Sequence, residues 1–381
     1  MDRTENTKRG FVQKLRDNGF FKPFYVTIYI LFGFGILVYI ISRFSSPFAE
    51  WWTRYPGQGI RLILAFLTSW LPFSLAECLV VLIPLFLFAV IAFAVRACVR
   101  KSTKELFRII MLLLTVILII SSTFLMGFGP SYFRYPLSDN LRLVDSPVSG
   151  DALYDTAIWL ADELDGILPD IVFAPEGESH LPLTYKEVCG EINEAYARVA
   201  SSYDFITSYT SYVKPIALSE YMTYTHISGV YTFFTGEANI NYNYPDFILP
   251  YTMAHEMSHQ RGIAKEDEAN FMAFLVCINS KNSYIKYSGY VNVLREVMSA
   301  LNKSDKDLYK KFVQTRYQKV ISAEMSAYSR FFDKYRESTA AKVVSTTNNA
   351  YLTSQNVKAG VKSYGLVTDL AVAYYMSEKG K

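Results

Sequence analysis

Several residue types that mark common classes of protein are scarce in this sequence. Its 381 residues include four cysteines, too few for a small disulfide-stapled scaffold. The formal net charge is only +3, and the basic residues concentrate near apolar segments, so nothing favours nucleic-acid binding. Hydrophobic residues make up 51% of the chain, and the mean hydropathy is +0.14. This composition is too apolar for an ordinary soluble protein and too polar for a wholly membrane-embedded one, so we expect both kinds of segment.

Charged residues are absent from three long apolar stretches, residues 24–42, 78–95 and 109–129. A helix needs about 20 mostly apolar residues to cross a bilayer, so each stretch is predicted to span the membrane. The first stretch is too long for the apolar part of a signal peptide and is followed by no small-residue cleavage pattern, so we expect it to stay attached. A fourth stretch, residues 62–73, is shorter and contains Pro72, which favours an interfacial or re-entrant helix.

The distribution of lysine and arginine predicts the orientation of these spans. Basic residues are frequent before the first span and between the second and third, and such segments stay in the cytoplasm. We therefore expect residues 1–130 to form a multi-pass anchor with a cytoplasmic N-terminus, and residues 131–381 to form an extracytoplasmic domain. Residues 134–151 have the composition of a linker. A disulfide between Cys189 and Cys277 is permitted in that domain, but nothing in the spacing requires it.

Histidine is also scarce, yet two of the four histidines lie in the segment AHEMSHQRGIAKEDEAN, residues 254–270. His255 and His259 are four residues apart, so on one helix they share a face and could bind one metal ion. In this His-Glu-x-x-His pattern Glu256 is not a ligand but takes a proton from the attacking water. Gly262 is suited to the end of such a helix. The alternative is a surface helix that carries these residues by coincidence.

A catalytic zinc site needs three protein ligands and an open position for water, so a third ligand is expected nearby. A second helix is predicted from about Lys265, and it offers Glu266 and Glu268. Glu266 is favoured, because Asn270 lies one turn further along the same face and could hydrogen-bond a histidine ligand. Glu268 shares its side of the helix with large apolar residues, and its alternative role is to favour the positive end of the helix dipole.

β-Forming residues alternate around a Gly-Glu turn between residues 229 and 245, which predicts a hairpin. Residues 239–243 could offer an exposed strand edge to an extended peptide substrate. An internal hairpin that packs on the helices is equally consistent with the pattern. His180 and His226 lie outside any metal-ligand spacing, and neither is assigned a role.

The C-terminal third of the chain is predicted to be mainly helical. Residues 283–334 have apolar side chains at intervals of three and four, which is typical of helices. Residues 345–360 have the composition of a loop, and residues 366–376 are predicted to form a last helix that could pack against the two metal-binding helices.

The segment EDEAN resembles the second-helix pattern of the glutamate zincins, which supplies the third zinc ligand, here Glu266. Over nearly its full length the chain is more closely similar to a bacterial membrane-protein family, DUF3810. The similarity lies in the three spans, in FTGEANINYNYPDFILPYTMAHEMSHQRGIAKEDEANF, and in NNAYLTSQNVKAGVKSYGLVTDL. That family is assigned as a metallopeptidase from the same motif, which implies a zinc cofactor but names no substrate. By analogy with related zincins, Tyr364 is a candidate donor to the oxyanion, although a buried structural phenol is the commoner role.

These features predict a mainly α fold, with three N-terminal transmembrane helices before an α-rich (α+β), zincin-like exported domain that contains a small β-hairpin or sheet. The predicted function is that of a membrane-anchored zinc-dependent peptidase, with His255, His259 and Glu266 as ligands and Glu256 as general base. Its predicted partners are a peptide or protein substrate and the lipid bilayer. The alternatives are a catalytically silent anchored sensor with zinc as a structural brace, and a membrane assembly protein whose acids cap helices.

Overall fold

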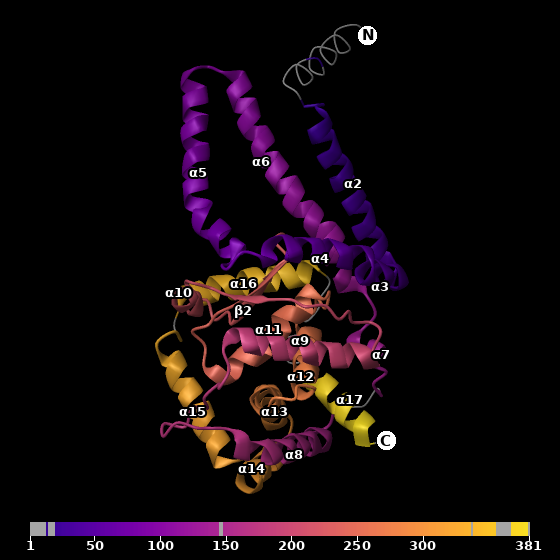
Figure 1. The fold of residues 1–381 in the computed structure, drawn as a ribbon, viewed down its shortest axis with the longest axis vertical. Helices are drawn as coiled ribbons and strands as arrows, with labels where there is room; N and C mark the ends of the chain where they lie inside the picture. The colour runs from indigo at the N-terminus through magenta and orange to yellow at the C-terminus, as the bar shows by residue number, and fades with distance from the viewer. Residues whose placement is uncertain (1–12, 14–19, 145–147, 337, 356–366, 380–381) are drawn as a thin grey trace.

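The computed structural model describes residues 13, 20–144, 148–336, 338–355 and 367–379. In this part of the chain the structure is mainly helical and contains one small sheet of three strands. Three long helices project from one end of the molecule, and the other helices and the sheet lie together at the opposite end (Figure 1). The mainly helical fold and the small sheet predicted from the sequence are therefore confirmed.

Three helices are long and apolar enough to cross a membrane. They are α2 (Pro23–Phe44), α5 (Leu75–Val99) and α6 (Thr103–Thr123), which continues as the π-helix η1 (Phe124–Phe128) and the 3-10 helix η2 (Gly129–Phe133). The three predicted spans are confirmed as helices, each longer than its apolar stretch. No residue in the most apolar window of α5 is buried by the rest of the protein, which is typical of a helix surrounded by lipid. These helices indicate that the protein associates with a membrane.

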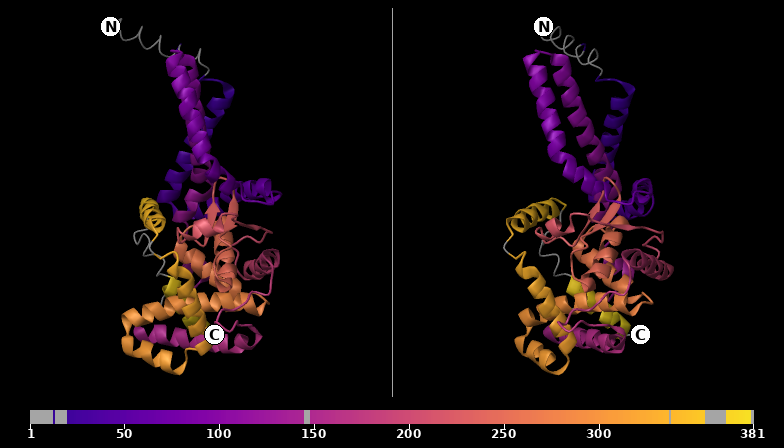
Figure 2. Two further views of the ribbon diagram at one scale, coloured as in Figure 1. Left: turned by 90° about the vertical axis from the view of Figure 1, so that its left-hand side faces the viewer. Right: turned by 60° about the vertical axis from the view of Figure 1, so that its left-hand side comes forward.

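Two shorter helices, α3 (Ser46–Arg54) and α4 (Pro56–Ser69), connect the first apolar helix to the second. α4 lies across the base of the long helices, roughly perpendicular to them (Figures 1 and 2). The helix predicted within residues 62–73 is thus present but begins earlier, because proline is favourable in a first helical turn. One face of α4 turns inward and buries Arg61, whereas the opposite face is apolar and exposed.

The sheet contains β1 (Val213–Pro215), β2 (Gly229–Thr232) and β3 (Glu237–Ile240) in the order β1-β3-β2. β2 and β3 form the predicted antiparallel hairpin, which turns through Gly236 at a φ of +73°. The expectation that residues 239–243 offer an exposed edge is wrong, because β1 pairs in parallel with β3 and makes it the central strand. Within the described residues, β2 is the outer strand of the hairpin, and the backbone of its Tyr231 is hydrogen-bonded to the Glu256 carboxyl.

Three helices form the centre of the part of the molecule below α4: α11 (Leu249–Gln260), α12 (Glu266–Ile278) and α13 (Ser283–Ser304). α12 and α13 approach closely at Gly289, where an added Cβ would lie 2.6 Å from Cβ of Cys277. The remaining helices surround this centre, and they confirm the helices predicted within residues 283–334 and at the C-terminal end. They are α7 (Leu137–Leu141), α8 (Gly150–Ile167), α9 (Tyr185–Ser202), α10 (Ser219–Thr223), α14 (Lys306–Thr315), α15 (Lys319–Asp333) and α17 (Val367–Lys379), with the short 3-10 helices η3 (Leu168–Asp170) and η4 (Asp246–Ile248).

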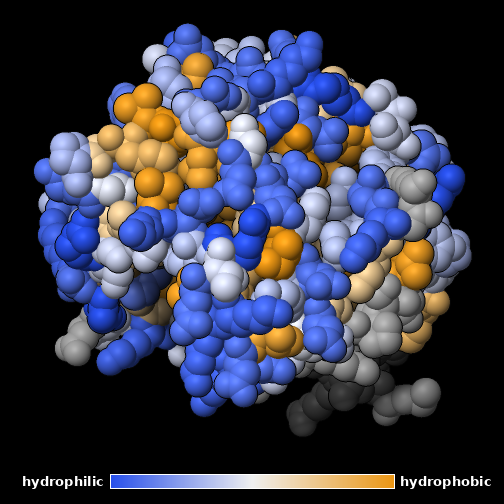
Figure 3. Space-filling model, turned by 90° about the horizontal axis from the view of Figure 1, so that it is seen from below, coloured by the Kyte–Doolittle hydropathy of each residue, from blue (hydrophilic) through white to orange (hydrophobic). Residues whose placement is uncertain are grey.

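The surface at the end of the molecule opposite the long apolar helices is more hydrophilic than the surface of those helices. Seen from that side, hydrophilic residues cover most of the molecule, and the apolar areas are scattered (Figure 3). This distribution is typical of a surface that faces water. The molecule therefore has a lipid-facing end and a water-facing end, as the composition predicts.

Two segments that were predicted to be irregular contain helices. Residues 345–354 of the expected loop belong to α16 (Thr339–Ser354), whose first turn contains the helix-favouring residues Ala340, Ala341 and Lys342, and residues 356–360 lie outside the described residues. The linker expected at residues 134–151 includes α7, whose leucines are buried in the core. Cys189 and Cys277 are both buried and form no disulfide.

Candidate metal centre

α11 carries both histidines of the His-Glu-x-x-His segment. Met253 and Met257 lie on one face of this helix and are buried in the core. His255 and His259 lie on the adjoining face, one turn apart, as their spacing predicts. The helix ends just before Gly262, whose φ of +86° lies in the left-handed region that favours glycine. This tight turn brings α12 back against α11.

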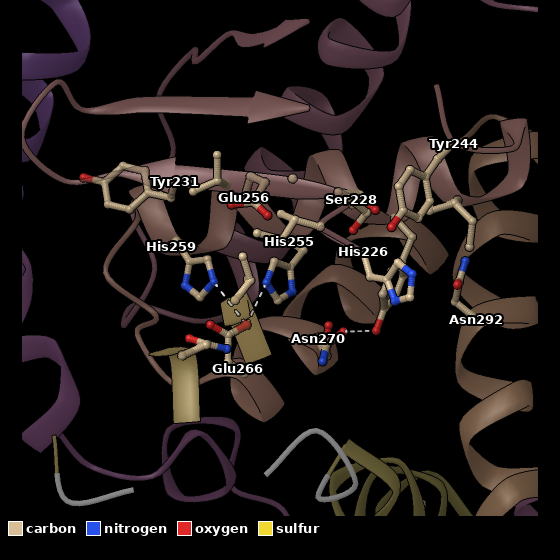
Figure 4. Close-up of a pocket in the computed structure, with 18 of the residues that line it drawn as sticks. His226, Ser228, Tyr231, Tyr244, His255, Glu256, His259, Glu266, Asn270 and Asn292 are labelled. Carbon is tan, nitrogen blue, oxygen red and sulfur yellow. Dashed lines mark hydrogen bonds and ion pairs between the residues drawn. The ribbon is translucent and has the colours of Figure 1, made fainter. Parts of the chain in front are cut away.

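The two helices bring three candidate metal ligands together (Figure 4). Nε2 of His255 lies 3.2 Å from Oε2 of Glu266, and Nε2 of His259 lies 3.6 Å from the same oxygen. The three ligand atoms all lie within 4.8 Å of one another. Two imidazole nitrogens and one carboxylate oxygen form a donor set that suits Zn²⁺. Of the two carboxylates that the sequence offers as third ligand, Glu266 is the one that faces the histidines.

Glu268 faces away from this cluster. Its Oε1 accepts a hydrogen bond of 3.1 Å from the backbone N–H of Leu137 and another of 2.9 Å from Nζ of Lys265. The side chain is buried. Glu268 therefore holds α7 against the start of α12, which is a larger structural role than favouring the positive end of its own helix.

The second nitrogens of the two imidazoles have different surroundings. Nδ1 of His259 lies 2.7 Å from the backbone oxygen of Ile263. A carbonyl only accepts hydrogen bonds, so Nδ1 carries the hydrogen and Nε2 presents its lone pair to a metal. Among the described residues, Nδ1 of His255 has no hydrogen-bond partner. The expectation that Asn270 bonds a histidine is therefore wrong; its backbone oxygen accepts a 2.8 Å hydrogen bond from the hydroxyl of Tyr251 instead.

Glu256 lies between the cluster and strand β2 (Figure 4). Gly229 of β2 makes room for it, because an added Cβ there would lie 2.7 Å from Oε1 of Glu256. Burial raises the pKa of the Glu256 carboxyl, although the two neighbouring histidines oppose the shift. Its Oε2 has no hydrogen-bond partner within the described part of the chain. A buried carboxyl with a free oxygen is suited to accept and release a proton.

The cluster favours a cation at its centre. Burial by itself would lower the pKa of His259, but the Glu266 carboxylate outweighs this effect and raises the pKa to about 9. Burial would likewise raise the pKa of Glu266, but His259 and His255 hold it well below its ordinary value. The same attraction that holds protons on the imidazoles would hold a metal ion that replaces them.

The cluster opens into a cleft of about 770 Å³. One wall is β2 with its flanking residues, and a second is the end of the third apolar helix, through Phe128 and Tyr132. α13 and α16 complete the lining, and α16 contributes Val343 and Val344. The cleft is therefore large enough for a segment of polypeptide, and it reaches the metal cluster directly.

The remaining candidates from the sequence lie elsewhere. His226 lines the cleft, but its Nε2 lies 2.8 Å from the backbone oxygen of Tyr335, on the side away from His259 (Figure 4). His180 is exposed, and its Nδ1 lies 3.4 Å from Oδ2 of Asp246. Tyr364 lies outside the described residues.

Two arginines from the N-terminal part of the chain hold the end of α11, and we call them the arginine clamp (Arg61 and Arg134). The Arg61 side chain is 1% exposed. Its Nε donates to the backbone oxygen of Gln260 at 3.1 Å, its Nη1 to that of Gly127 at 2.6 Å, and its Nη2 to that of Thr53 at 2.9 Å. Burial lowers the pKa of Arg61 to about 10, so the guanidinium stays charged at neutral pH.

Arg134 completes the clamp from the other side of the turn. Its Nη1 donates to the backbone oxygen of Gly262 at 3.0 Å, and its Nη2 pairs with Oε1 of buried Glu50 at 2.7 Å. The sequence gives little sign of either contact, because both partners in the turn lie more than a hundred residues away. The one available signal is Arg61 itself, a charged residue among the apolar side chains of α4.

A second buried carboxyl lies away from the cluster, in α15. Oε1 of Glu324 accepts a 2.9 Å hydrogen bond from the backbone N–H of Ser179, and the hydroxyl of Tyr287 donates to Oε2. Burial raises the pKa of Glu324 to about 7. This carboxyl joins α15 to α13 and serves the fold rather than the metal centre.

Fold and site together define a membrane-associated, mainly helical protein with a buried cluster of two histidines and a glutamate beside a cleft. Residues 53–372 match the family described as "Protein of unknown function (DUF3810)", and the chain belongs to that family. No curated protein and no solved structure matches the chain. The family match begins within α3 and ends within α17, so it includes the arginine clamp and the whole cluster.

Proposed function

We propose that this protein is a membrane-anchored, zinc-dependent peptidase in which His255, His259 and Glu266 bind the metal and Glu256 acts as general base. The observation that carries the proposal is the convergence of these four side chains at the wall of an open cleft. Structural zinc sites are closed by four protein ligands, whereas catalytic sites have three and an open position. Three ligand groups beside a cleft support the catalytic kind.

The surrounding residues have roles that fit peptide hydrolysis. A bound Zn²⁺ would supply a Lewis acid and lower the pKa of water to about 7. His259 is oriented for binding by the Ile263 carbonyl. Glu256 takes a proton from the water that attacks the peptide carbonyl and passes it to the leaving amine, and its burial raises its affinity for that proton.

Strand β2 provides a surface for the substrate backbone. Its outer edge borders the cleft beside the cluster, Val230 in its middle is partly exposed, and the backbone of Tyr231 is bonded to Glu256. An extended peptide can add to such an edge through backbone hydrogen bonds. The strand that we expect to hold the substrate is therefore β2, in place of residues 239–243. We include in the proposal that β2 lies beside α11 as the substrate-binding strand of a zincin lies beside the helix that carries its metal ligands.

The decisive experiment uses the full chain, purified in detergent without chelator. We expect one zinc per chain, which His255→Ala should remove. Glu256→Gln should keep the zinc but lower hydrolysis of a randomised peptide library by about 100- to 10 000-fold, because it removes the general base. His180→Ala is the matched control, since this exposed histidine should affect neither property.

Each other outcome has a definite meaning. A wild-type protein without stoichiometric transition metal would rule out the proposal. A protein that binds zinc but cleaves no member of the library would support a sensor in which the metal is a structural brace. If Glu256→Gln hydrolysed the library as fast as the wild type, Glu256 would have no part in the mechanism.

We also propose that the cleft lies on the extracytoplasmic side. The support is the basic connection between α5 and α6, which lies at the end of the apolar helices away from the cleft (Figure 1). Reporter fusions should be cytoplasmic when joined after Lys104 and external when joined after Ser131. A cytoplasmic reporter after Ser131 would reverse the orientation.

A further inference from the structure

A band of large apolar side chains marks the level of the membrane surface. α4 exposes Phe66 and Trp70, each 76% exposed, together with Ile63 and Leu67 on the same face. Trp51 of α3, the helix that precedes α4, is 50% exposed. An exposed apolar face next to membrane-spanning helices is covered by lipid, and tryptophan is enriched at the interface with water. We call these five residues the apolar belt.

The sheet lies directly beneath the apolar belt. Oγ1 of Thr68 in α4 donates to the backbone oxygen of Thr235 at 3.3 Å. At Gly236 an added Cβ would lie 2.5 Å from the backbone nitrogen of Ala65, so the hairpin turn touches the backbone of α4. The carboxylate of Glu237 accepts a 2.8 Å hydrogen bond from the backbone N–H of Ala76, at the start of the second spanning helix. Among the described residues, the sheet is thus in direct contact with α4 and with the start of α5.

The metal centre lies directly beneath the sheet, because Gly229 of β2 contacts Glu256 of α11. The sheet therefore lies between α4 and the part of α11 that carries Glu256, whereas the end of α11 is reached directly by Arg61 of α4. Packed layers lie about 10 Å apart, so the candidate ligands on α11 lie no more than about 20 Å from the axis of α4. Extended polypeptide rises about 3.3 Å per residue, and about six residues cover this distance.

The cleft also extends from the cluster towards the membrane. Phe128, where the third spanning helix ends, lies with its ring centroid 6.1 Å from that of His259 and 5.2 Å from that of Tyr231. Opposite this wall, α16 presents Val343, which is 60% exposed although it lines the cleft. Apolar side chains thus continue from the membrane level to the candidate ligands.

We propose that the substrate is a polypeptide anchored in the same membrane, and that the bond cleaved lies about six to ten residues from the bilayer surface. The proposal rests on the peptidase function above and adds its substrate class. A short tether can reach the cleft because only one layer of protein lies between the cleft and the apolar belt. A site on the far side of the molecule would need a much longer tether.

The test places the full chain in lipid nanodiscs with lipid-tethered peptides. Each peptide carries a randomised segment joined to phosphatidylethanolamine through a Gly-Ser spacer of about 6, 12 or 30 residues, with an untethered library as reference. We expect metal-dependent cleavage at the shortest spacer. The 30-residue spacer should be cut about fourfold more slowly than the 12-residue one, because effective concentration falls as the −3/2 power of tether length once the tether is longer than the distance it covers.

The outcomes separate this proposal from the function on which it rests. Cleavage with the long spacer but not the short one, or equal rates for tethered and untethered peptides, would overturn the membrane-proximal substrate and leave the peptidase intact. No metal-dependent cleavage of any peptide would overturn both. Cleavage lost in Glu256→Gln at every spacer length confirms that the measured hydrolysis belongs to this site.

A second measurement tests the position of the apolar belt without using activity. Lipids brominated near the headgroup quench tryptophans that lie at the interface. We expect strong quenching in the wild type and clearly less in a variant with Trp51→Phe and Trp70→Phe, which leaves the buried Trp52 and, in the core, Trp159 as references. Equal quenching in the two proteins would place the belt away from the bilayer and overturn the proposal.

Discussion

Replacing Arg61 with alanine should destabilise the fold and weaken metal binding together. The substitution removes the donor from the backbone oxygens of Gln260, Gly127 and Thr53, all of which lie around a fully buried guanidinium. An unsatisfied buried polar group costs about 1 to 3 kcal/mol, so three such groups should lower the free energy of unfolding by at least about 3 kcal/mol. Because Gln260 directly follows His259, we also expect a 10- to 100-fold loss of zinc affinity, on the order found for outer-shell residues.

The assay is unfolding of the full chain in detergent, followed by circular dichroism, with zinc affinity measured by chelator competition. Arg61→Lys should fall between wild type and Arg61→Ala, because an ammonium keeps the charge and some donors but lacks the planar fork. Arg336→Ala is the control, since this exposed arginine pairs with Asp333 at the surface and should change stability by less than about 0.5 kcal/mol. Unchanged stability and zinc affinity in Arg61→Ala would refute the role of the clamp.

Three further predictions follow from individual side chains. Glu268→Ala should keep its zinc but lower the free energy of unfolding by about 2 kcal/mol, because the donors on Leu137 and Lys265 are left without their acceptor. Glu266→Ala should lose the metal. The reverse result in metal analysis would reassign the third ligand. Gly229→Ala should keep zinc but slow hydrolysis, because its Cβ displaces the carboxyl of Glu256, and a variant with wild-type rates would contradict this reading. The pKa of Glu324 is raised from 4.5 to about 7, so the folded state binds its proton more tightly than the unfolded state. The unfolding free energy of the wild type, relative to that of Glu324→Gln, should therefore be greatest below pH 4.5 and should fall by up to about 3 kcal/mol as the pH rises to 7. If the unfolding free energies of the two proteins changed with pH in parallel, the carboxyl would not titrate in this way.

Features that depend on local sequence could be predicted well. The spans follow from uninterrupted apolar stretches, and the hairpin follows from alternation around a turn. The register of His255 against His259 follows from helical spacing, and the sharp turn follows from Gly262, which adopts the positive φ expected of it. Because the turn is short, the choice of Glu266 over Glu268 could also be made from the helical face on which each lies.

Features that depend on long-range contacts could not be predicted. β1 has three residues, and nothing in that length shows that it pairs in parallel with β3 and removes the expected free edge. The hydrogen bond expected of Asn270 is absent: Nδ1 of His259 lies against the backbone oxygen of Ile263, and Nδ1 of His255 has no partner among the described residues. Arg61 contacts Gln260 across 199 positions of sequence, a separation that no local pattern reports.

The arginine clamp has a consequence for the folding of the newly made chain and for any fragment that proteolysis releases from it. The turn between the helices that carry the candidate ligands is held by two side chains from earlier parts of the chain, Arg61, 199 residues before Gln260, and Arg134, 128 residues before Gly262. A newly made chain can therefore complete this turn only when α4 and the segment after the third apolar helix have folded against it. Shedding of the water-exposed part by a cut behind the third span would separate Arg61 from the centre that it supports. A fragment released in this way would lack a contact that supports the turn between α11 and α12, and on the proposed function we expect it to bind zinc weakly and to be inactive.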